Sequence, residues 1–218
     1  MITIVDYGMG NLRSVQKSFE FIGKKAVITS DRNKILKSSL VVVPGVGSFN
    51  AAMKNLRKLK LIDTILKVVN GGKYFLGLCL GLQILFEYSE EGNSKGLGIL
   101  KGKVKKFKFK DNLKIPHMGW NNVNLNVSAR ISGAVRGSST SDLRKIFKGI
   151  ECESYFYFVH SYYIEPEDNN IIASTTDYGI RFASSVFNKN VFATQFHPEK
   201  SQRNGLRLLK NYVDYTGN

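Results

Sequence analysis

A cysteine flanked by a glycine two positions away on either side, in Gly77-Leu78-Cys79-Leu80-Gly81, constrains the fold more than any other feature. The apolar run at 73–76 predicts a buried strand before it, and residues 82–87 predict a helix after it. A nucleophile at such a sharp turn needs small neighbours, because its backbone is strained and the helix packs closely on the strand. The helix dipole would favour the Cys79 thiolate. The motif alone also fits a buried structural cysteine.

The first half of the chain alternates short apolar runs with amphipathic segments. Strands are predicted at 2–5, 26–29, 40–43 and 73–76, and helices at 15–22 and 51–69. Continuous apolar runs are typical of parallel strands that are buried on both faces. We therefore expect an α/β fold with a central, mostly parallel sheet covered by helices. Its functional site should lie at the carboxyl ends of the strands.

The second half is predicted to be largely β, with a helix at its end. Strands are expected at 104–109, 123–127, 155–159, 171–174, 182–187 and 191–195, and the helix at 203–212. Residues 128–142, rich in Ser, Gly and Arg, predict an exposed loop that marks no domain boundary. We expect residues 1–218 to form one domain.

The chain is strongly basic, with 32 Lys and Arg against 17 Asp and Glu and a formal net charge of +15. This excess favours polyanions, phosphorylated metabolites or an acidic partner without choosing among them. The densest basic run, 103–110, alternates lysines with phenylalanines in its second half. That alternation predicts a half-buried strand whose lysine-covered face protects a sheet edge. Since the basic residues are otherwise scattered, a nucleic-acid-binding module is a remote alternative and we expect no nucleic-acid partner.

Several classes of protein are disfavoured by what the sequence lacks. No run approaches the roughly 18 apolar residues of a membrane-spanning helix. The amino terminus shows no basic leader or cleavage site. Cys79 and Cys152 are the only cysteines, which fits a reducing compartment better than a disulfide framework, and neither belongs to a metal-ligand spacing. We expect a cytoplasmic protein without a membrane contact, metal or cofactor.

A thiol nucleophile needs a base within reach and a group that orients the base. His197 follows an apolar predicted strand, and Glu199 lies two residues further on. Pro198 stiffens the link between them, so imidazole and carboxylate are expected together at the rim of the sheet. The other histidines, His117 and His160, have no carboxylate close in sequence, and each alone would more often be structural.

A glycine-containing segment, 44–49, follows the third predicted strand. The two glycines beside Val46 allow the backbone to present its N–H groups in orientations closed to other residues. An oxyanion site requires such donors. A plain turn between strand and helix would have the same composition.

Six motifs together carry a resemblance that covers nearly the whole chain. They lie at 6–12, 44–49, 77–83, 116–121, 157–162 and 197–199. The chain resembles the class I (triad) glutamine amidotransferases, which hydrolyse glutamine and pass ammonia to a synthase. Among them, it is most similar to the glutaminase subunits of imidazole glycerol phosphate synthase.

The resemblance implies a thioester mechanism. Cys79 would attack the side-chain amide of glutamine, His197 would act as acid and then as base, and Glu199 would orient His197. The backbone amides of Leu80 and, after a local peptide rearrangement, of Val46 would meet the oxyanion. The residues implied to line the glutamine pocket are Gly47, Gln83, His160 and Ser161.

The resemblance also implies a heterodimer with a (β/α)8 cyclase subunit. The cyclase would receive ammonia through the interface and use it on a ribotide of histidine biosynthesis, giving imidazole glycerol phosphate and aminoimidazole carboxamide ribotide. A paralogue that feeds a nucleotide-sugar or lipopolysaccharide-sugar amidotransferase is the alternative, because the same triad serves both. The motif positions implied near the interface are Asn11, Met118, Trp120, Tyr157 and Lys200. Trp120, the only tryptophan, is expected in its core.

The sequence departs from the family pattern in two places. Residues 128–147 look longer and more basic than the family usually has there, which affects local loop structure rather than chemistry. Leu78 and Leu82 stand where the family often has Ile and Met. These exchanges keep the apolar volume nearly constant and should be tolerated.

Overall fold

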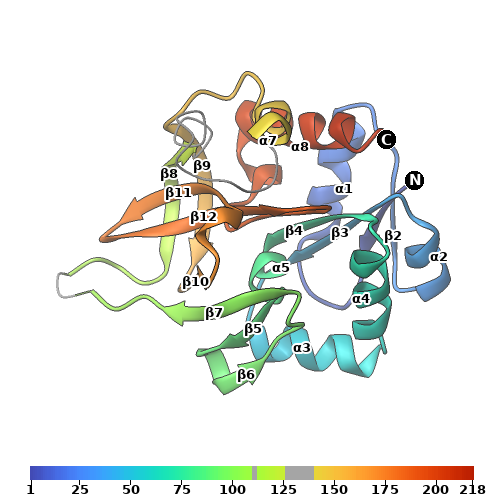
Figure 1. The fold of residues 1–218 in the computed structure, drawn as a ribbon, viewed down its shortest axis with the longest axis horizontal. Helices are drawn as coiled ribbons and strands as arrows, with labels where there is room; N and C mark the ends of the chain where they lie inside the picture. Colours follow the sequence, from blue (N-terminus) through green and yellow to red (C-terminus); the bar gives the residue numbers. More distant parts are fainter. Residues whose placement is uncertain (110–111, 126–139) are drawn as a thin grey trace.

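The computed structural model describes residues 1–109, 112–125 and 140–218, and within them thirteen strands form one connected sheet (Figure 1). The strands are β1 (Ile2–Val5), β2 (Ala26–Thr29), β3 (Leu40–Gly45), β4 (Tyr74–Cys79), β5 (Phe86–Ser89), β6 (Ser94–Lys95), β7 (Leu100–Lys106), β8 (His117–Leu125), β9 (Ser154–His160), β10 (Tyr162–Pro166), β11 (Ile172–Tyr178), β12 (Ile180–Asn188) and β13 (Val191–Thr194). The helices are α1 (Leu12–Phe21), α2 (Arg32–Lys37), α3 (Phe49–Lys58), α4 (Ile62–Asn70), α5 (Leu80–Gln83), α7 (Thr140–Ile146) and α8 (Gln202–Tyr215).

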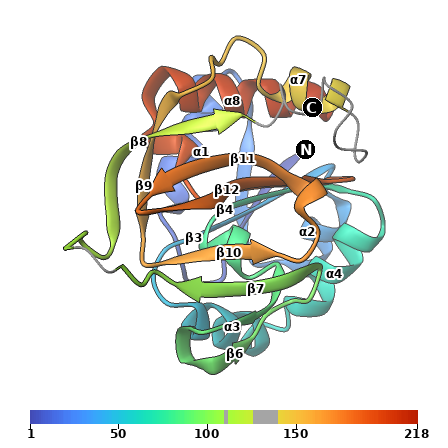
Figure 2. The same cartoon turned by 60° about the vertical axis from the view of Figure 1, so that its left-hand side comes forward.

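The sheet has a parallel centre and an antiparallel extension. The order β2-β1-β3-β4-β13 is parallel throughout, which confirms the predicted α/β fold with a mostly parallel central sheet. The sheet continues as β12-β10-β7-β5-β6, and β11, β8 and β9 branch from β12 (Figure 2). The carboxyl ends of β3, β4 and β13 therefore lie side by side, and three distant segments of the chain emerge together there.

Helices cover both faces of the parallel strands. In Figure 1, α1, α7 and α8 lie on one side and α3 and α4 on the other. Phe19 of α1 and Leu208 of α8 belong to one buried cluster, and Met53 of α3 and Ile65 of α4 belong to the other. Full burial of one such side chain contributes about 1.5–3 kcal/mol. This two-sided burial explains why the central strands read as continuous apolar runs.

The prediction of one helix over 51–69 is wrong, because the segment forms two helices, α3 and α4. At the break Lys60 adopts a φ of +55°. The Lys60 N–H bonds to the Arg57 carbonyl at 3.0 Å, and the Leu61 N–H bonds to the Leu56 carbonyl at 2.9 Å. This is the hydrogen-bond pattern of a Schellman ending, which usually has glycine where Lys60 stands. The apolar spacing continues across the break and hides it in the sequence.

The helix predicted at 82–87 is also wrong beyond its first residues. The helix that follows Cys79, α5, is a single turn that ends at Gln83, and Phe86 begins β5. Phe86 is fully buried, and β5 pairs in parallel with β7. Pairing with a strand more than ten residues away outweighs the local helical spacing of the apolar residues. The strands β6 and β10 likewise have no counterpart among the predicted elements.

The basic run 103–110 does not lie at a sheet edge. Its strand, β7, lies between β10 and β5. Lys101 and Lys103 are exposed while Leu100 and Val104 are buried, so the strand has a lysine-covered face, but β7 ends at Lys106 and the predicted strand residues 107–109 lie beyond it. Lys103 and Lys105 also pair with Glu165 of β10, at 3.5 and 3.2 Å. The lysines therefore cover an interior strand, and residue 110 lies outside the described part of the chain.

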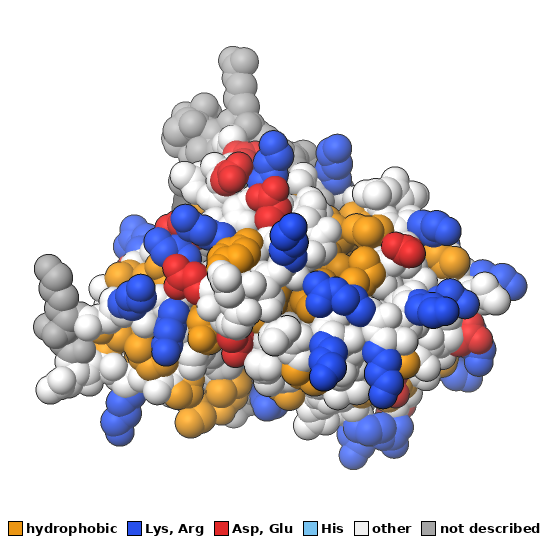
Figure 3. All heavy atoms as spheres, turned by 90° about the horizontal axis from the view of Figure 1, so that it is seen from below, with side chains coloured by type: hydrophobic (Ala, Val, Ile, Leu, Met, Phe, Trp, Pro, Cys, Tyr) orange, Lys and Arg blue, Asp and Glu red, His pale blue; other side chains and the backbone are white. Residues whose placement is uncertain are grey.

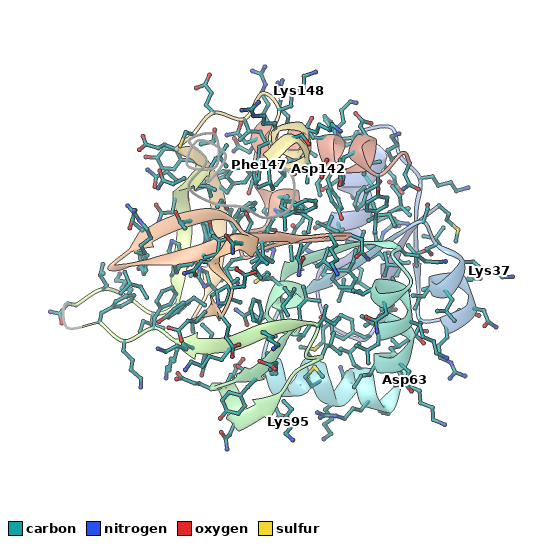
Figure 4. All side chains as sticks on the ribbon, in the orientation of Figure 1. Lys37, Asp63, Lys95, Asp142, Phe147 and Lys148 are labelled. Carbon is teal, nitrogen blue, oxygen red and sulfur yellow. The ribbon has the colours of Figure 1, made fainter. Side chains whose placement is uncertain are left out.

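The loop predicted at 128–142 falls mostly on residues that the structure does not describe, namely 128–139. The prediction is wrong for 140–142, which begin α7. Leu143 is fully buried, and Phe147 packs edge-on against a phenylalanine of β13 with ring centroids 5.9 Å apart. Lys148, the next residue, is exposed (Figure 4). In β8, the predicted strand 123–127 begins earlier, at His117, and residues 126–127 lie outside the described part.

The surface of the molecule agrees with the scattered distribution of charge in the sequence. Figure 3 shows Lys and Arg side chains spread over one face, with acidic and apolar side chains between them. Among the residues that the structure describes, no helix is long and apolar enough to cross a membrane.

Candidate active site

Cys79 ends β4 in a strained turn. Its backbone has φ +54° and ψ −105°, a conformation that costs a non-glycine residue about 1–3 kcal/mol. The two glycines of the motif permit this turn by close packing. A Cβ atom on Gly77 would lie 2.6 Å from the Gly81 carbonyl oxygen, and one on Gly81 would lie 1.8 Å from the Val43 carbonyl oxygen. The sharp strand-to-helix elbow predicted from the glycine spacing is therefore present.

The neighbouring strands bring the other predicted segments to the same place. Gly45 at the end of β3 pairs with Cys79, so Val46 follows at the level of the elbow. Thr194 at the end of β13 pairs with Leu78, and His197 follows three residues later. The carboxyl ends of three parallel strands thus assemble the site, as expected for this class of sheet.

His197 and Glu199 form a buried pair. His197 Nδ1 and Glu199 Oε1 are 2.7 Å apart, and each side chain is only 3% exposed. The backbone N–H of His197 bonds to the Tyr157 carbonyl at 2.9 Å, and the hydroxyl of Ser201 donates to the His197 carbonyl at 2.6 Å. The backbone of His197 is therefore held on both sides, and Nδ1 of its imidazole is directed at the carboxylate.

The electrostatics of His197 link it to the cysteine. Burial opposes the charged form, but the charge and hydrogen-bonding capacity of Cys79, followed by those of Glu199, raise the His197 pKa to about 10. Nε2 of His197 is buried, and no hydrogen bond of ordinary length reaches it from the described residues, although Cys79 is near enough to act on the charge of the ring. Such an orphaned donor is costly unless a ligand or a reacting group meets it. The arrangement suits a thiolate–imidazolium pair that exchanges a proton with a bound molecule.

A cavity of about 260 Å³ opens beside the sulfur. Its wall contains the predicted site residues Val46, Gly47, Cys79, Leu80, Gln83, His160 and Ser161. Glu91 and Tyr162 also line it, and neither is among the predicted pocket residues. Glu91 lies in a short 3-10 segment, Glu91–Asn93, without a motif of its own. Its carboxylate accepts a hydrogen bond from the Phe49 N–H at 2.7 Å.

The two remaining histidines form a pair next to this cavity. His117 Nδ1 and His160 Nε2 are 2.9 Å apart, and His160 Nδ1 lies 2.8 Å from the Tyr162 carbonyl oxygen. Burial lowers the pKa of His117 to about 4 and that of His160 to about 3, so both are neutral near pH 7. His160 therefore lines the cavity with its ring, while both of its nitrogens are engaged elsewhere.

Four of the five residues implied at a partner interface are near the surface of β8, β9 and the turn after His197. Met118 and Trp120 are 63% and 46% exposed. The rings of Trp120 and Tyr157 meet edge to face at 6.1 Å, and Lys200 Nζ lies 5.7 Å from the Tyr157 ring centroid. Asn11 has a local role, since its side chain accepts a bond from the N–H of a serine in the first turn of α1 at 3.2 Å.

The described residues form neither a metal site nor a disulfide. No group of three His, Cys, Asp or Glu side chains there could hold a metal ion. Cys79 is buried, Cys152 is exposed, and neither forms a disulfide.

Comparisons with known proteins agree on one family. Residues 3–214 match the family model described as glutamine amidotransferase class-I. The imidazole glycerol phosphate synthase subunit HisH of Syntrophotalea carbinolica is 46% identical, covering 98% of this chain and 100% of that protein. The subunit of the same name from Methanocaldococcus jannaschii is 47% identical, covering 98% and 99%. The structure of PurLQS from Thermotoga maritima has a TM-score of 0.71 at 17% identity, covering 98% and 97%, and supports the fold alone.

Proposed function

Because the chain belongs to the class-I glutamine amidotransferases, and among them to the HisH subunits of imidazole glycerol phosphate synthase, we propose that it hydrolyses glutamine and supplies ammonia to a cyclase subunit. The buried His197–Glu199 pair, together with Cys79 at the wall of the cavity, is the observation that carries the chemistry. The products would be glutamate and ammonia, the latter used in histidine biosynthesis.

In the first half of the reaction, the Cys79 thiolate adds to the side-chain carbonyl carbon of glutamine. The tetrahedral intermediate collapses as the C–N bond breaks, and the departing nitrogen takes a proton from Nε2 of His197. Ammonia leaves, and a glutamyl thioester remains on Cys79. The raised pKa of His197, about 10, supports this role, because the imidazole then holds a proton at neutral pH.

In the second half, neutral His197 accepts a proton from water as the water oxygen adds to the thioester carbon. Collapse of this intermediate expels the thiolate and releases glutamate, and the proton stays on His197. Glu199 holds Nδ1–H throughout, which keeps Nε2 as the atom that exchanges protons. The starting thiolate–imidazolium pair is thereby restored.

Both intermediates carry a negative oxygen that needs donors. The backbone N–H groups of Leu80 and Val46 are the candidates, because both residues line the cavity next to Cys79. Gly47 has a φ of +101°, which leaves the peptide units around Val46 orientations that other residues avoid. Removal of one oxyanion donor typically costs about 3 kcal/mol in the barrier. Rotation of this segment would therefore regulate the rate.

The cavity favours one small polar substrate. Its volume of about 260 Å³ is below the roughly 300–1,000 Å³ of pockets for larger ligands. The Glu91 carboxylate at its wall suits the α-ammonium group of an amino acid. Neutral His160 and the polar Ser161 add no competing charge. These features support glutamine rather than a phosphorylated ligand.

We place the cyclase on the exposed surface formed by Met118, Trp120, Tyr157 and Lys200. Aromatic residues and methionine are enriched in the cores of protein interfaces. The Tyr157 carbonyl bonds to the His197 N–H, so this surface is one hydrogen bond from the proposed base. Channelling of ammonia across a heterodimer interface, in the cytoplasm, completes the proposal.

The test is glutamate release by the purified chain, alone and with a co-expressed (β/α)8 cyclase and its ribotide substrate. We expect release to rise strongly with cyclase and ribotide, and Cys79→Ser to abolish it. If cyclase and ribotide do not raise glutamate release, and ammonia is transferred to a sugar amidotransferase instead, the chain has the paralogous function. Salt-sensitive nucleic-acid binding that is indifferent to Cys79→Ser would reject the enzyme altogether.

A further inference from the structure

Gln195 is a buried polar residue that the mechanism above does not use. It follows β13, two residues before His197, and its side chain is 0% exposed. Its amide nitrogen lies 3.7 Å from Cys79 Sγ, and its amide oxygen lies 3.0 Å from the amide nitrogen of Gln83. A buried amide in contact with the nucleophile needs a reason, because burial without good partners would destabilise the fold.

The direction of these hydrogen bonds follows from one backbone carbonyl. The Tyr162 oxygen can only accept, and it lies 3.0 Å from the Gln83 side-chain amide. The Gln83 atom facing it is therefore the NH₂ group, which donates. The same NH₂ group faces Gln195, so Gln195 must present its oxygen there. Its own NH₂ group is left to point at the sulfur of Cys79.

A second chain of bonds fixes the same carbonyl. His160 donates from Nδ1 to the Tyr162 oxygen, so its Nε2 accepts from His117 Nδ1–H at 2.9 Å. The remaining nitrogen of His117 accepts from the Asn121 amide at 3.2 Å. None of the hydrogen bonds in this chain can reverse without leaving two acceptors face to face. These bonds hold the Tyr162 carbonyl, which orients the Gln83 amide and through it the Gln195 amide.

Besides His197, the sulfur of Cys79 has two further neighbours, one suited to each of its protonation states. As a thiol, Cys79 donates weakly to the Val159 carbonyl oxygen, with 3.9 Å between sulfur and oxygen. As a thiolate, Cys79 can only accept hydrogen bonds, and the Val159 carbonyl oxygen has no hydrogen to donate to it. The Gln195 amide is a donor within hydrogen-bonding distance of the sulfur. Hydrogen bonds to charged acceptors are stronger than those to neutral ones, so this contact favours the thiolate.

We propose that Gln195 is a further catalytic residue, which stabilises the Cys79 thiolate by donating an N–H to its sulfur, and that Gln83 positions Gln195. The inference deepens the proposed glutaminase function and rests on it. The role does not involve contact with glutamine, since Gln195 is not part of the cavity wall. It therefore predicts a loss of nucleophile reactivity without a matching loss of substrate affinity.

The strongest variant is Gln195→Glu, which keeps the shape and the oxygen that faces Gln83 but replaces the donor with a carboxylate whose own charge also opposes the thiolate, so the neutral Gln195→Met decides the role of the donor. Alkylation of Cys79 by iodoacetamide, followed by mass spectrometry from pH 5 to 10, reports the thiolate directly. A Cys152→Ser background removes the exposed second cysteine. We expect alkylation near pH 7 to slow by about tenfold or more, and the pH profile to move to higher pH.

A matched set of variants separates the donor from packing. Gln195→Met fills a similar volume without a donor, and should slow alkylation in the same direction by a smaller factor. If the buried carboxylate of Gln195→Glu unfolds the chain, Gln195→Met provides the comparison alone. Thr176→Val is the control, because the Thr176 hydroxyl is buried without a partner among the described residues, and it should leave the profile unchanged.

Steady-state kinetics with the cyclase complex complete the test. We expect kcat to fall about tenfold or more in the Gln195 variants, with KM for glutamine changed less than about threefold. An alkylation profile identical to that of the parent, in a folded Gln195 variant, overturns the proposal. Glutamate release that survives Cys79→Ser would instead overturn the glutaminase function, so the two failures are distinguishable.

Discussion

Replacing Glu199 by Gln would test the charge state of the proposed base. The variant keeps the size of the side chain but removes the negative charge that lies 2.7 Å from His197 Nδ1. The rise in the pKa of His197 from 6.5 to about 10 corresponds to about 5 kcal/mol in favour of the imidazolium. Cys79 contributes more of this rise than Glu199. We therefore assign about 2 kcal/mol to Glu199, within the range for charged hydrogen bonds.

The sign of the pH dependence follows from the raised pKa. A histidine whose pKa is higher in the folded than in the unfolded chain stabilises the folded chain. Its contribution is complete at pH values below the unfolded-state pKa of 6.5. That stabilisation is lost as pH rises through the folded value of about 10. The parent should thus exceed Glu199→Gln in free energy of unfolding by about 2 kcal/mol at pH 6, and the difference should vanish by about pH 10.

Urea unfolding at pH 6, 8 and 10 measures this difference directly. Glu167→Gln is the control, because Glu167 is an exposed carboxylate and should show no such trend. Glutamate release by Glu199→Gln should fall at least about a hundredfold, since the imidazole loses the partner that orients it. A stability difference that is the same at all three pH values would refute a charged His197 in the folded chain.

Three further predictions concern the elbow, the neighbouring strand and the proposed interface. Gly81→Ala should unfold the chain or lower its melting temperature sharply, because the new Cβ would meet a β3 carbonyl at 1.8 Å, whereas Gly23→Ala has open space and should cost about 1 kcal/mol. Tyr7→Phe removes the 2.8 Å bond to the Pro44 carbonyl and should cost about 1–3 kcal/mol in urea unfolding. Trp120→Ala should uncouple glutamine hydrolysis from cyclase product formation, and unchanged coupling with normal assembly would reject the interface.

Local chain geometry made the turn at Cys79 and the pairing of His197 with Glu199 predictable. The two glycines around Cys79 indicate that backbone segments approach each other closely there. The structure agrees, because a Cβ atom on Gly77 or Gly81 would collide with a neighbouring carbonyl oxygen. His197 and Glu199 are two residues apart, so their pairing depends little on the rest of the fold. The central strands were predictable because burial on both faces leaves an apolar run.

Features that depend on tertiary pairing could not be predicted in the same way. The turn at Lys60 uses a residue with no turn preference, within a continuous apolar spacing. β5 exists because β7 lies beside it, and nothing local distinguishes 84–89 from a helix. Gln195 and Glu91 had no signal, because their importance comes from neighbours more than forty positions away in the chain.

Tyr157 serves two purposes with two separable parts of one residue. Its ring belongs to the exposed surface with Trp120 and Lys200, while its backbone carbonyl holds the His197 N–H. Substitution can change the ring but not the carbonyl. In the proposed complex, the ring that faces the cyclase could therefore be exchanged without altering the bond that holds the backbone of His197.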